Sequence, residues 1–216
     1  MNDLDPMDRI DALVRGPWSD PQHPPARVGH ELRRLGAWLL SAEPTPDELV
    51  ALADALARLG GEPRPASRYG PGPALSPADV PRLRPNGNGT HPLCGPVNPI
   101  SPPLTVRVEG THAIGEAVYD TRFEGLPGLV QGGFIAAGFD LMLGQGVVLA
   151  GKGGPTGTLS VRYVAPTPLH QALRYETWTE RIEGRRIHAR GTLSVVASGL
   201  VTAEAEGVFV APRDAS

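Results

Sequence analysis

One segment constrains the fold more than any other. Residues 132–150, GGFIAAGFDLMLGQGVVLA, are apolar at every helical angle and hold one ionisable group, Asp140. The run is long enough for a helix, and a helix that is apolar all round is typical of a protein interior, so we expect it to be buried. An unpaired carboxylate is costly there, so Asp140 suggests a cavity with chemistry, although a helix-edge position or a structural hydrogen bond would also account for it.

The sequence around this segment alternates as antiparallel strands do. Apolar residues occupy alternate positions at 104–108, 159–163, 187–195 and 201–210. Glu183-Gly184 and Ser198-Gly199 are typical of hairpin turns. A long apolar helix among antiparallel strands buries most of its apolar surface when the sheet wraps around it. The sequence therefore predicts an α+β protein with the hot-dog fold, an antiparallel sheet wrapped around a long central helix.

The first half of the chain has a different character. Most of the 24 prolines lie before Leu104, and leucines spaced by three and four residues predict two helices, at about 27–41 and 46–59. Thr45 and Glu48 form a capping box for the second helix. Residues 62–91 are rich in Pro and Gly and lack periodicity. We expect a helical N-terminal extension at 1–61, a linker at 62–91 and a hot-dog domain at 92–212.

Composition excludes several classes of function. A net charge of -3 and a pI near 6.1 provide no basic surface for nucleic acid. No stretch has the roughly 18 apolar residues free of helix breakers that a membrane span needs, and the acidic N-terminus lacks the features of a signal peptide. A single cysteine, Cys94, excludes an internal disulfide, and the six histidines lack metal-ligand spacing. We expect a cytoplasmic protein without a metal.

Several short motifs follow one another in a recognisable order. They are Asn98-Pro99-Ile100, Glu124-Gly125-Leu126-Pro127-Gly128, Val130-Gln131-Gly132-Gly133, Asp140, Thr156-Gly157-Thr158-Leu159-Ser160-Val161-Arg162-Tyr163 and Pro166-Thr167-Pro168-Leu169. Their order and spacing resemble the hot-dog-fold acyl-CoA thioesterases of the phenylacetate-pathway (PaaI-like) type. The resemblance covers roughly residues 92 to 211.

The resemblance implies roles for individual residues. Gly132, at the start of the helix, would donate its backbone N–H to the thioester carbonyl, with support from the helix dipole. Asp140 would act as general base on water or as nucleophile, and Thr156 would orient the carboxylate or the water. Gln131 completes the catalytic set and stands where the family has His. The implied substrate-binding residues are Gly128, Gly133, Thr158 and Arg162.

The expected function is hydrolysis of an acyl-CoA thioester to a free acid and CoA, without a cofactor. Relatives build the acyl tunnel between two subunits, so a homodimer or a dimer of dimers is expected. Gln131 cannot become cationic, and Leu141 stands where many close relatives have Glu. These departures leave open a non-catalytic acyl-CoA-binding protein. A hot-dog hydratase or dehydratase is a further alternative, which would need a His-containing acid/base pair.

Overall fold

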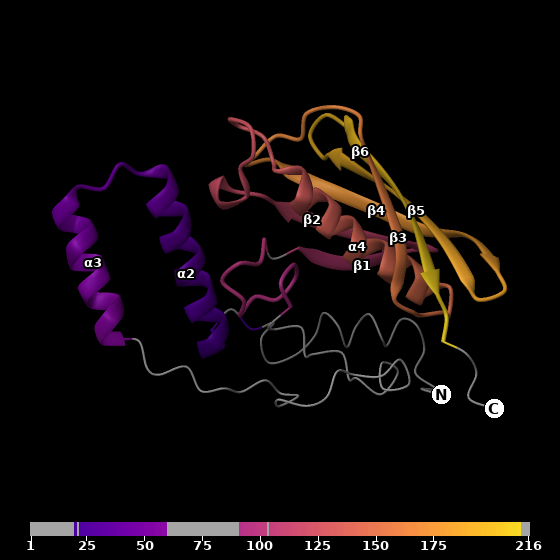
Figure 1. Cartoon of the computed structure of the whole chain (residues 1–216), viewed down its shortest axis with the longest axis horizontal. Coiled ribbons are helices and arrows are strands. Elements are labelled where there is room, and N and C mark those ends of the chain that lie inside the picture. Colours follow the sequence, from indigo (N-terminus) through magenta and orange to yellow (C-terminus); the bar gives the residue numbers. More distant parts are fainter. Residues whose placement is uncertain (1–19, 21, 60–90, 103, 213–216) are drawn as a thin grey trace.

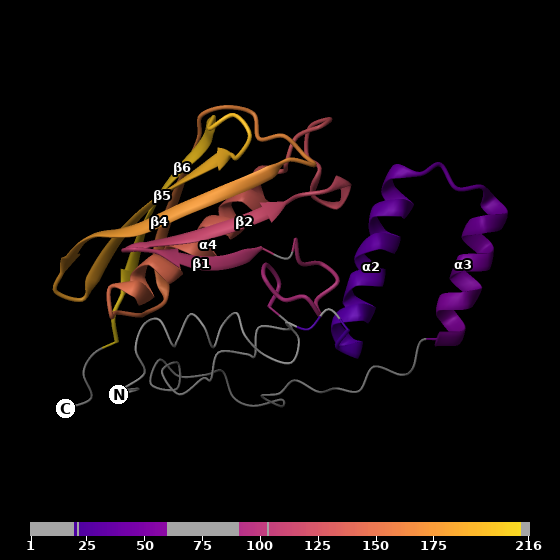
Figure 2. The same ribbon diagram turned by 180° about the vertical axis from the view of Figure 1, so that it is seen from behind.

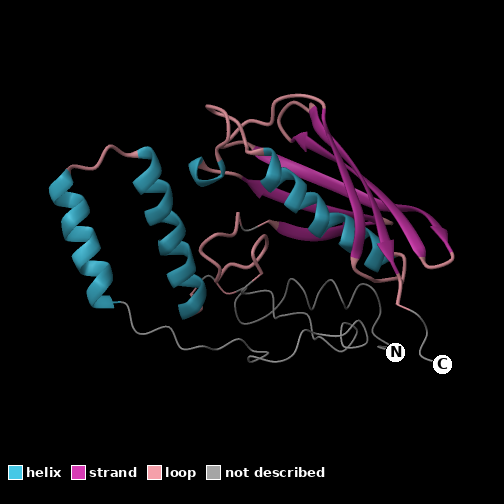
Figure 3. Cartoon of the chain, viewed as in Figure 1, coloured by secondary structure: helices cyan, strands magenta, loops and turns pink. Residues whose placement is uncertain are grey.

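The computed structural model describes residues 20, 22–59, 91–102 and 104–212. Helices α2 (Pro24–Ser41) and α3 (Pro46–Leu59) come first. The predicted linker at 62–91 lies outside the described residues except for His91, so the domain boundaries stay predictions. The remaining elements form one domain, shown in Figures 1 and 3: β1 (Thr105–Glu109), β2 (His112–Val118), a 3-10 turn η4 (Thr121–Phe123), α4 (Gly132–Leu149), β3 (Thr156–Tyr163), β4 (Ala172–Glu183), β5 (Arg186–Val195) and β6 (Val201–Val210).

The six strands form a single antiparallel sheet in the order β1-β2-β4-β5-β6-β3. Gly184 and Gly199 take the positive φ angles of 58° and 70° that the predicted hairpin turns require. Register shifts in the β3–β6, β4–β5 and β5–β6 pairings interrupt the ladder, and such bulges bend a sheet. Helix α4 lies across one face of the bent sheet (Figures 1 and 2), which confirms the predicted hot-dog fold.

Strands β2 and β4 were not predicted. In β4, Leu173, Tyr175 and Thr177 alternate with Arg174 and Glu176, so the period of two is present in the sequence. In β2 the alternation is blurred because three consecutive residues, at 113–115, are all buried. Both strands lie inside the sheet, and among the strands β4 makes the most extensive contact with α4.

The core forms where α4 meets the sheet. Phe139, Met142 and Leu143 on the inner face of the helix are fully buried. Two threonines of β4 bond the helix backbone, since Thr177 Oγ1 donates to the Met142 carbonyl at 2.6 Å and Thr179 Oγ1 to the Gly146 carbonyl at 3.0 Å. A Cβ at position 146 would lie 3.2 Å from the backbone nitrogen of Trp178, so glycine allows this close approach.

The expectation that α4 is buried on every side is wrong for the single chain. The side opposite the sheet is accessible, with Asp140 exposed and Phe134 at 37% relative exposure. The physical reason is geometric, because the sheet of one chain reaches only one face of the helix. Burying the other apolar face requires a second surface.

Helix α4 is apolar enough to be compared with a membrane span, although its glycines and Asp140 interrupt the apolar run. Over Gly132–Leu149 its mean hydropathy is 1.5, and by length and composition it is the one helix among the described residues that could cross a bilayer. In the structure it packs against the sheet with 44% of these residues buried, as the core helix of a hot-dog domain does.

The two N-terminal helices attach to the domain very differently. Arg33 on α2 is buried, and its Nη1 donates to the carbonyls of Pro96 and Asn98 at 2.6 and 3.1 Å. Helix α3 has no buried residue, and Figure 2 shows it on the far side of α2 from the sheet. The predicted capping box is confirmed, because the Thr45 N–H donates to Glu48 at 2.8 Å and the Glu48 N–H to Thr45 Oγ1 at 3.3 Å.

Candidate active site

The structure brings Asp140 and Thr156 together. Asp140 lies on the open side of α4 and Thr156 opens the edge strand β3. The Thr156 hydroxyl donates to Asp140 Oδ1 at 2.7 Å, and both residues are exposed in the single chain. This bond fixes the direction of the carboxylate and occupies one of its oxygens. Oδ2 remains accessible, and a carboxylate oxygen can accept a proton from a water molecule.

The N-terminus of α4 presents a hydrogen-bond donor. Among the described residues, no hydrogen bond uses the Gly132 N–H. The N-terminus of a helix also carries a positive potential, so this amide suits an oxygen on which negative charge develops. The Tyr163 hydroxyl donates to the Gly132 carbonyl at 2.7 Å and thereby holds the next peptide unit, Gly132–Gly133, from the β3 side. A Cβ at position 132 would lie 3.0 Å from that hydroxyl, which explains the glycine.

Gln131 caps this helix. Its Oε1 accepts hydrogen bonds from the N–H groups of Gly133 and Phe134 at 2.6 and 3.3 Å. The engaged atom of the Gln131 amide is its oxygen, so this side chain acts here as an acceptor. The Gly133 N–H is consequently turned toward the cap, and Gly132 is left with the free amide.

A pocket of about 380 Å³ adjoins the free amide. Apolar side chains form most of its wall, and Gln131, Tyr163 and Thr167 contribute polar groups. The lining residues are Gly125, Leu126, Leu129, Val130, Gln131, Gly132, Ile135, Tyr163, Ala165, Pro166 and Thr167. A volume of this size lies in the range of small-molecule sites.

The other residues that the resemblance pointed to lie in separate places. Gly128 has a φ of 75° and donates its N–H to Glu124 at 2.6 Å, in the loop that leads to the pocket. Thr158 and Arg162 are exposed on β3, and Arg162 lies 3.6 Å from Glu204 of β6. Arg162 therefore has a carboxylate beside it.

The free amide and the carboxylate are too far apart to act together within one chain. Eight residues of α4 separate Gly132 from Asp140, which corresponds to about 12 Å along the helix axis. A thioester carbonyl has to lie about 3 Å from both its hydrogen-bond donor and its attacking group. One chain thus holds two half-sites.

Other chemistry has little support in the part of the chain that the structure describes. Burial raises the pKa of Cys94 to about 11, so this thiol stays protonated at neutral pH and is a poor nucleophile. Within the described ranges, no three residues among His, Cys, Asp and Glu cluster in a way that could hold a metal ion.

Tyr163 is the residue that the sequence analysis missed at this site. It was interpreted only as one of the inward-facing residues of its strand, yet it is 53% exposed. Its hydroxyl bonds Gly132 at the N-terminus of α4, which lies 31 residues earlier in the sequence, and no local pattern specifies such a contact. Its position in the thioesterase-like Val161-Arg162-Tyr163 motif was the available signal.

The chain is similar to known thioesterases both in sequence and in structure. No protein-family model matches the chain. Over 87 residues, or 40% of its length, the chain is 32% identical to the acyl-coenzyme A thioesterase THEM4 of Xenopus laevis, and the match spans only 39% of that relative. A crystal structure described as a thioesterase superfamily protein superposes with a TM-score of 0.70 at 28% identity, covering 86% of this chain and 94% of the other. The chain thus has the hot-dog fold in common with a thioesterase superfamily structure, and part of it is similar in sequence to an acyl-coenzyme A thioesterase.

Proposed function

We propose that this protein hydrolyses an acyl-CoA thioester to a free acid and CoA. The observation that carries the proposal is the 2.7 Å hydrogen bond that holds Asp140 against Thr156 on the open side of α4. The THEM4 relative is named for this activity, and its similarity supports the assignment of substrate class.

In this mechanism the thioester oxygen accepts a hydrogen bond from the Gly132 N–H at the positive end of α4. Asp140 removes a proton from a water molecule, the hydroxide attacks the carbonyl carbon, and negative charge moves to the carbonyl oxygen. Collapse of that intermediate breaks the carbon–sulfur bond, and the CoA thiolate takes up a proton. Direct attack by Asp140, followed by hydrolysis of the mixed anhydride, uses the same groups. Thr156 keeps the carboxylate in position in both routes.

The separation of the half-sites implies two copies of the chain. In the proposed homodimer, Gly132 of one copy and Asp140 of the other face the same thioester. The open face of α4 and the exposed edge strand β3 support this arrangement, because both lie where the second copy would pack. The pocket of about 380 Å³ beside Gly132 would hold the apolar end of the substrate.

The test is thiol release from a panel of acyl-CoAs, from acetyl to palmitoyl and including phenylacetyl, with the mass in solution measured by light scattering. We expect a dimer or a multiple of it, and a kcat for Asp140→Asn that is lower by roughly 10²–10⁴, the usual contribution of a general base. Thr156→Val should show a smaller loss in kcat. Asp54→Asn, an exposed change on α3, is the matched control and should leave the rate unaltered.

Two results would contradict the proposal. A rate that survives Asp140→Asn would remove the carboxylate from the mechanism. Wild-type protein that binds acyl-CoA without releasing thiol would instead indicate a binding protein, the function that the replacement of the family His by Gln131 makes the second candidate. A monomer with full activity would overturn the shared site alone.

A further inference from the structure

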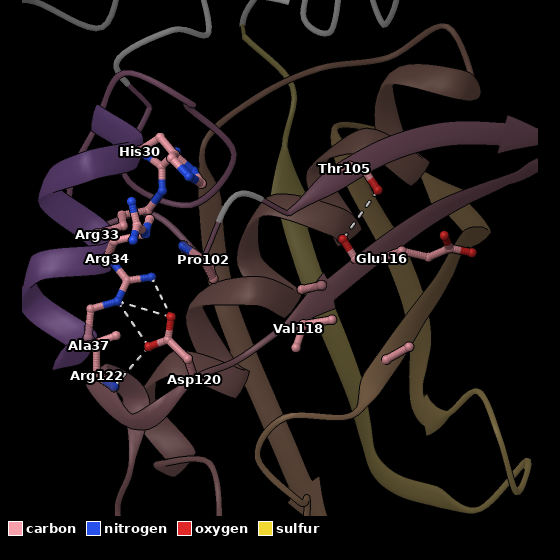
Figure 4. A pocket seen from close by; sticks show the side chains of 12 residues that line it. His30, Arg33, Arg34, Ala37, Pro102, Thr105, Glu116, Val118, Asp120 and Arg122 are labelled. Atoms are coloured by element: carbon pink, nitrogen blue, oxygen red, sulfur yellow. Dashed lines mark hydrogen bonds and ion pairs between the residues drawn. The ribbon is translucent and has the colours of Figure 1, made fainter. Parts of the chain in front are cut away.

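A second pocket, distinct from the candidate active site, lies between α2 and the hot-dog domain. Its volume is about 530 Å³, again within the range of small-molecule sites. In Figure 4, His30, Arg33, Arg34 and Ala37 of α2 lie along one wall, Glu116 and Val118 of β2 lie opposite, and Asp120 and Arg122 lie near the lower end of α2. The lining residues are His30, Arg33, Arg34, Ala37, Pro102, Thr105, Glu116, Ala117, Val118, Asp120, Arg122 and Ala172.

The lining of this pocket holds more arginines than carboxylates. Asp120 is engaged by Arg122, whose Nε and Nη2 donate to it at 2.9 and 2.8 Å. Glu116 extends away from α2 in Figure 4 and pairs with Arg107 at 2.8 Å. Arg34 pairs with Glu31 on the surface at 2.8 Å. Among the described residues, these pairings leave no carboxylate bonded to Arg33.

The absence of a bonded carboxylate matters most for Arg33, because this residue is only 8% exposed. Its Nη1 donates to two backbone carbonyls, which anchors α2, while no described residue accepts from its Nε or Nη2. A buried charge without a counter-charge is costly. Burial lowers the pKa of Arg33 most, the neighbouring Arg122 lowers it further, and Asp120 raises it to a smaller extent.

The rest of the pocket is suited to an apolar group. Ala37 of α2, Pro102, Ala117, Val118 and Ala172 supply hydrocarbon surface next to the guanidinium. A ligand that matches both features has one anionic head and an apolar body. The planar fork formed by Nε and Nη2 fits a carboxylate in a two-point hydrogen bond.

We propose that this pocket binds a carboxylic acid with an apolar body, its carboxylate on Arg33 and its hydrocarbon part against Ala37 and Val118. An excess of one charge favours a monoanion over the several negative charges of a nucleotide. The free acid from thioester hydrolysis belongs to this chemical class, but binding here does not depend on the proposed function.

The experiment is calorimetric titration of the full-length protein with octanoate. Wild type should bind, and Arg33→Gln should bind about 30-fold more weakly, as is usual when one partner of a buried charged hydrogen bond is removed. Ala37→Leu fills the pocket without changing the charge and should weaken binding to a similar extent, which keeps the test decisive if Arg33→Gln fails to fold. Arg27→Gln changes an exposed arginine of α2 outside the pocket and should have no effect.

Two further arms separate this pocket from other sites. Asp140→Ala should bind octanoate as wild type does, and an octanoate affinity that changes in that variant would place the acid in the active site and overturn the proposal. Titration with 3′,5′-ADP tests whether the pocket binds the phosphates of CoA. If 3′,5′-ADP binds in an Arg33-dependent way and octanoate does not bind, the proposal is also overturned. An octanoate affinity that neither Arg33→Gln nor Ala37→Leu changes would also overturn the proposal.

Discussion

The hot-dog domain and the N-terminal helices both contain regular apolar stripes, but they use them differently. In the hot-dog domain, Leu143, Leu173 and Leu193 are completely buried between α4 and the sheet. On α3, Leu56 and Leu59 are 42% and 83% exposed. Apolar periodicity therefore predicts a regular element, a helix or a strand, in both regions, yet only in the first does the same chain provide the surface that the apolar residues pack against.

Helix α2 stands between these two extremes. It is held chiefly by polar and close backbone contacts, through Arg33 and the segment at 91–102. An isolated helix as short as α3 is marginal in water, and its stability normally comes from packing. We therefore expect the three regions to respond to substitutions with decreasing effects on global stability.

The largest effect is expected in the core. Leu143→Ala removes a fully buried side chain beneath the sheet and should lower the free energy of unfolding by about 2–5 kcal/mol. Leu56→Ala is the matched change on α3 and should cost less than about 1 kcal/mol. Chemical denaturation followed by fluorescence measures both. Equal losses would show that α3 is packed in solution as tightly as the core.

A smaller effect is expected where α2 meets the domain. A Cβ at Gly29 would lie 2.5 Å from the Pro96 carbonyl oxygen, so Gly29→Ala should displace α2 at a cost of about 1–3 kcal/mol. Limited proteolysis should then cleave the N-terminal helices while the hot-dog domain persists. Gly36→Ala is the control on the same helix, because its Cβ would lie 3.2 Å from the flexible Arg122 side chain. An unchanged cleavage pattern in Gly29→Ala would argue against the docked position of α2.

The smallest effect is expected at the start of α3. Thr45→Ala removes the capping hydroxyl and should destabilise the helix locally by about 1 kcal/mol, seen as faster hydrogen exchange in its first turn. Thr45→Ser keeps the hydroxyl and should restore the protection. Global stability should not change, since nothing in α3 is buried. A drop in the unfolding midpoint would instead mean that α3 supports the rest of the protein.

The Glu48 carboxylate adds a pH dependence to the same cap. Hydrogen bonds from Thr45, first of all from its backbone N–H, lower the pKa of Glu48. A lowered folded-state pKa stabilises the helix above the unfolded-state pKa, and the contribution is lost as the pH falls through the folded-state value. Protection of the first turn of α3 should therefore decrease on acidification, and more so in wild type than in Thr45→Ala.

Local patterns in the sequence were sufficient for much of the fold. The apolar run of α4, the alternation in β1, β3, β5 and β6, the glycine turns and the Thr45–Glu48 cap all depend on neighbours within a few residues, so the sequence alone determined them. The pairing of Asp140 with Thr156 was predicted through the resemblance to thioesterases, and no local pattern would have revealed it.

Tertiary structure decided what each face contacts. Only the tertiary structure shows that Asp140 is exposed, that Gln131 caps the N–H groups of Gly133 and Phe134 and leaves that of Gly132 free, and that Tyr163 bonds the Gly132 carbonyl. Likewise, Arg33 lies 63 residues from the Pro96 carbonyl that it bonds, and its missing counter-charge is visible only once α2 is docked. Burial and electrostatic balance depend on residues distant in sequence, which is why periodicity along the chain could not specify them.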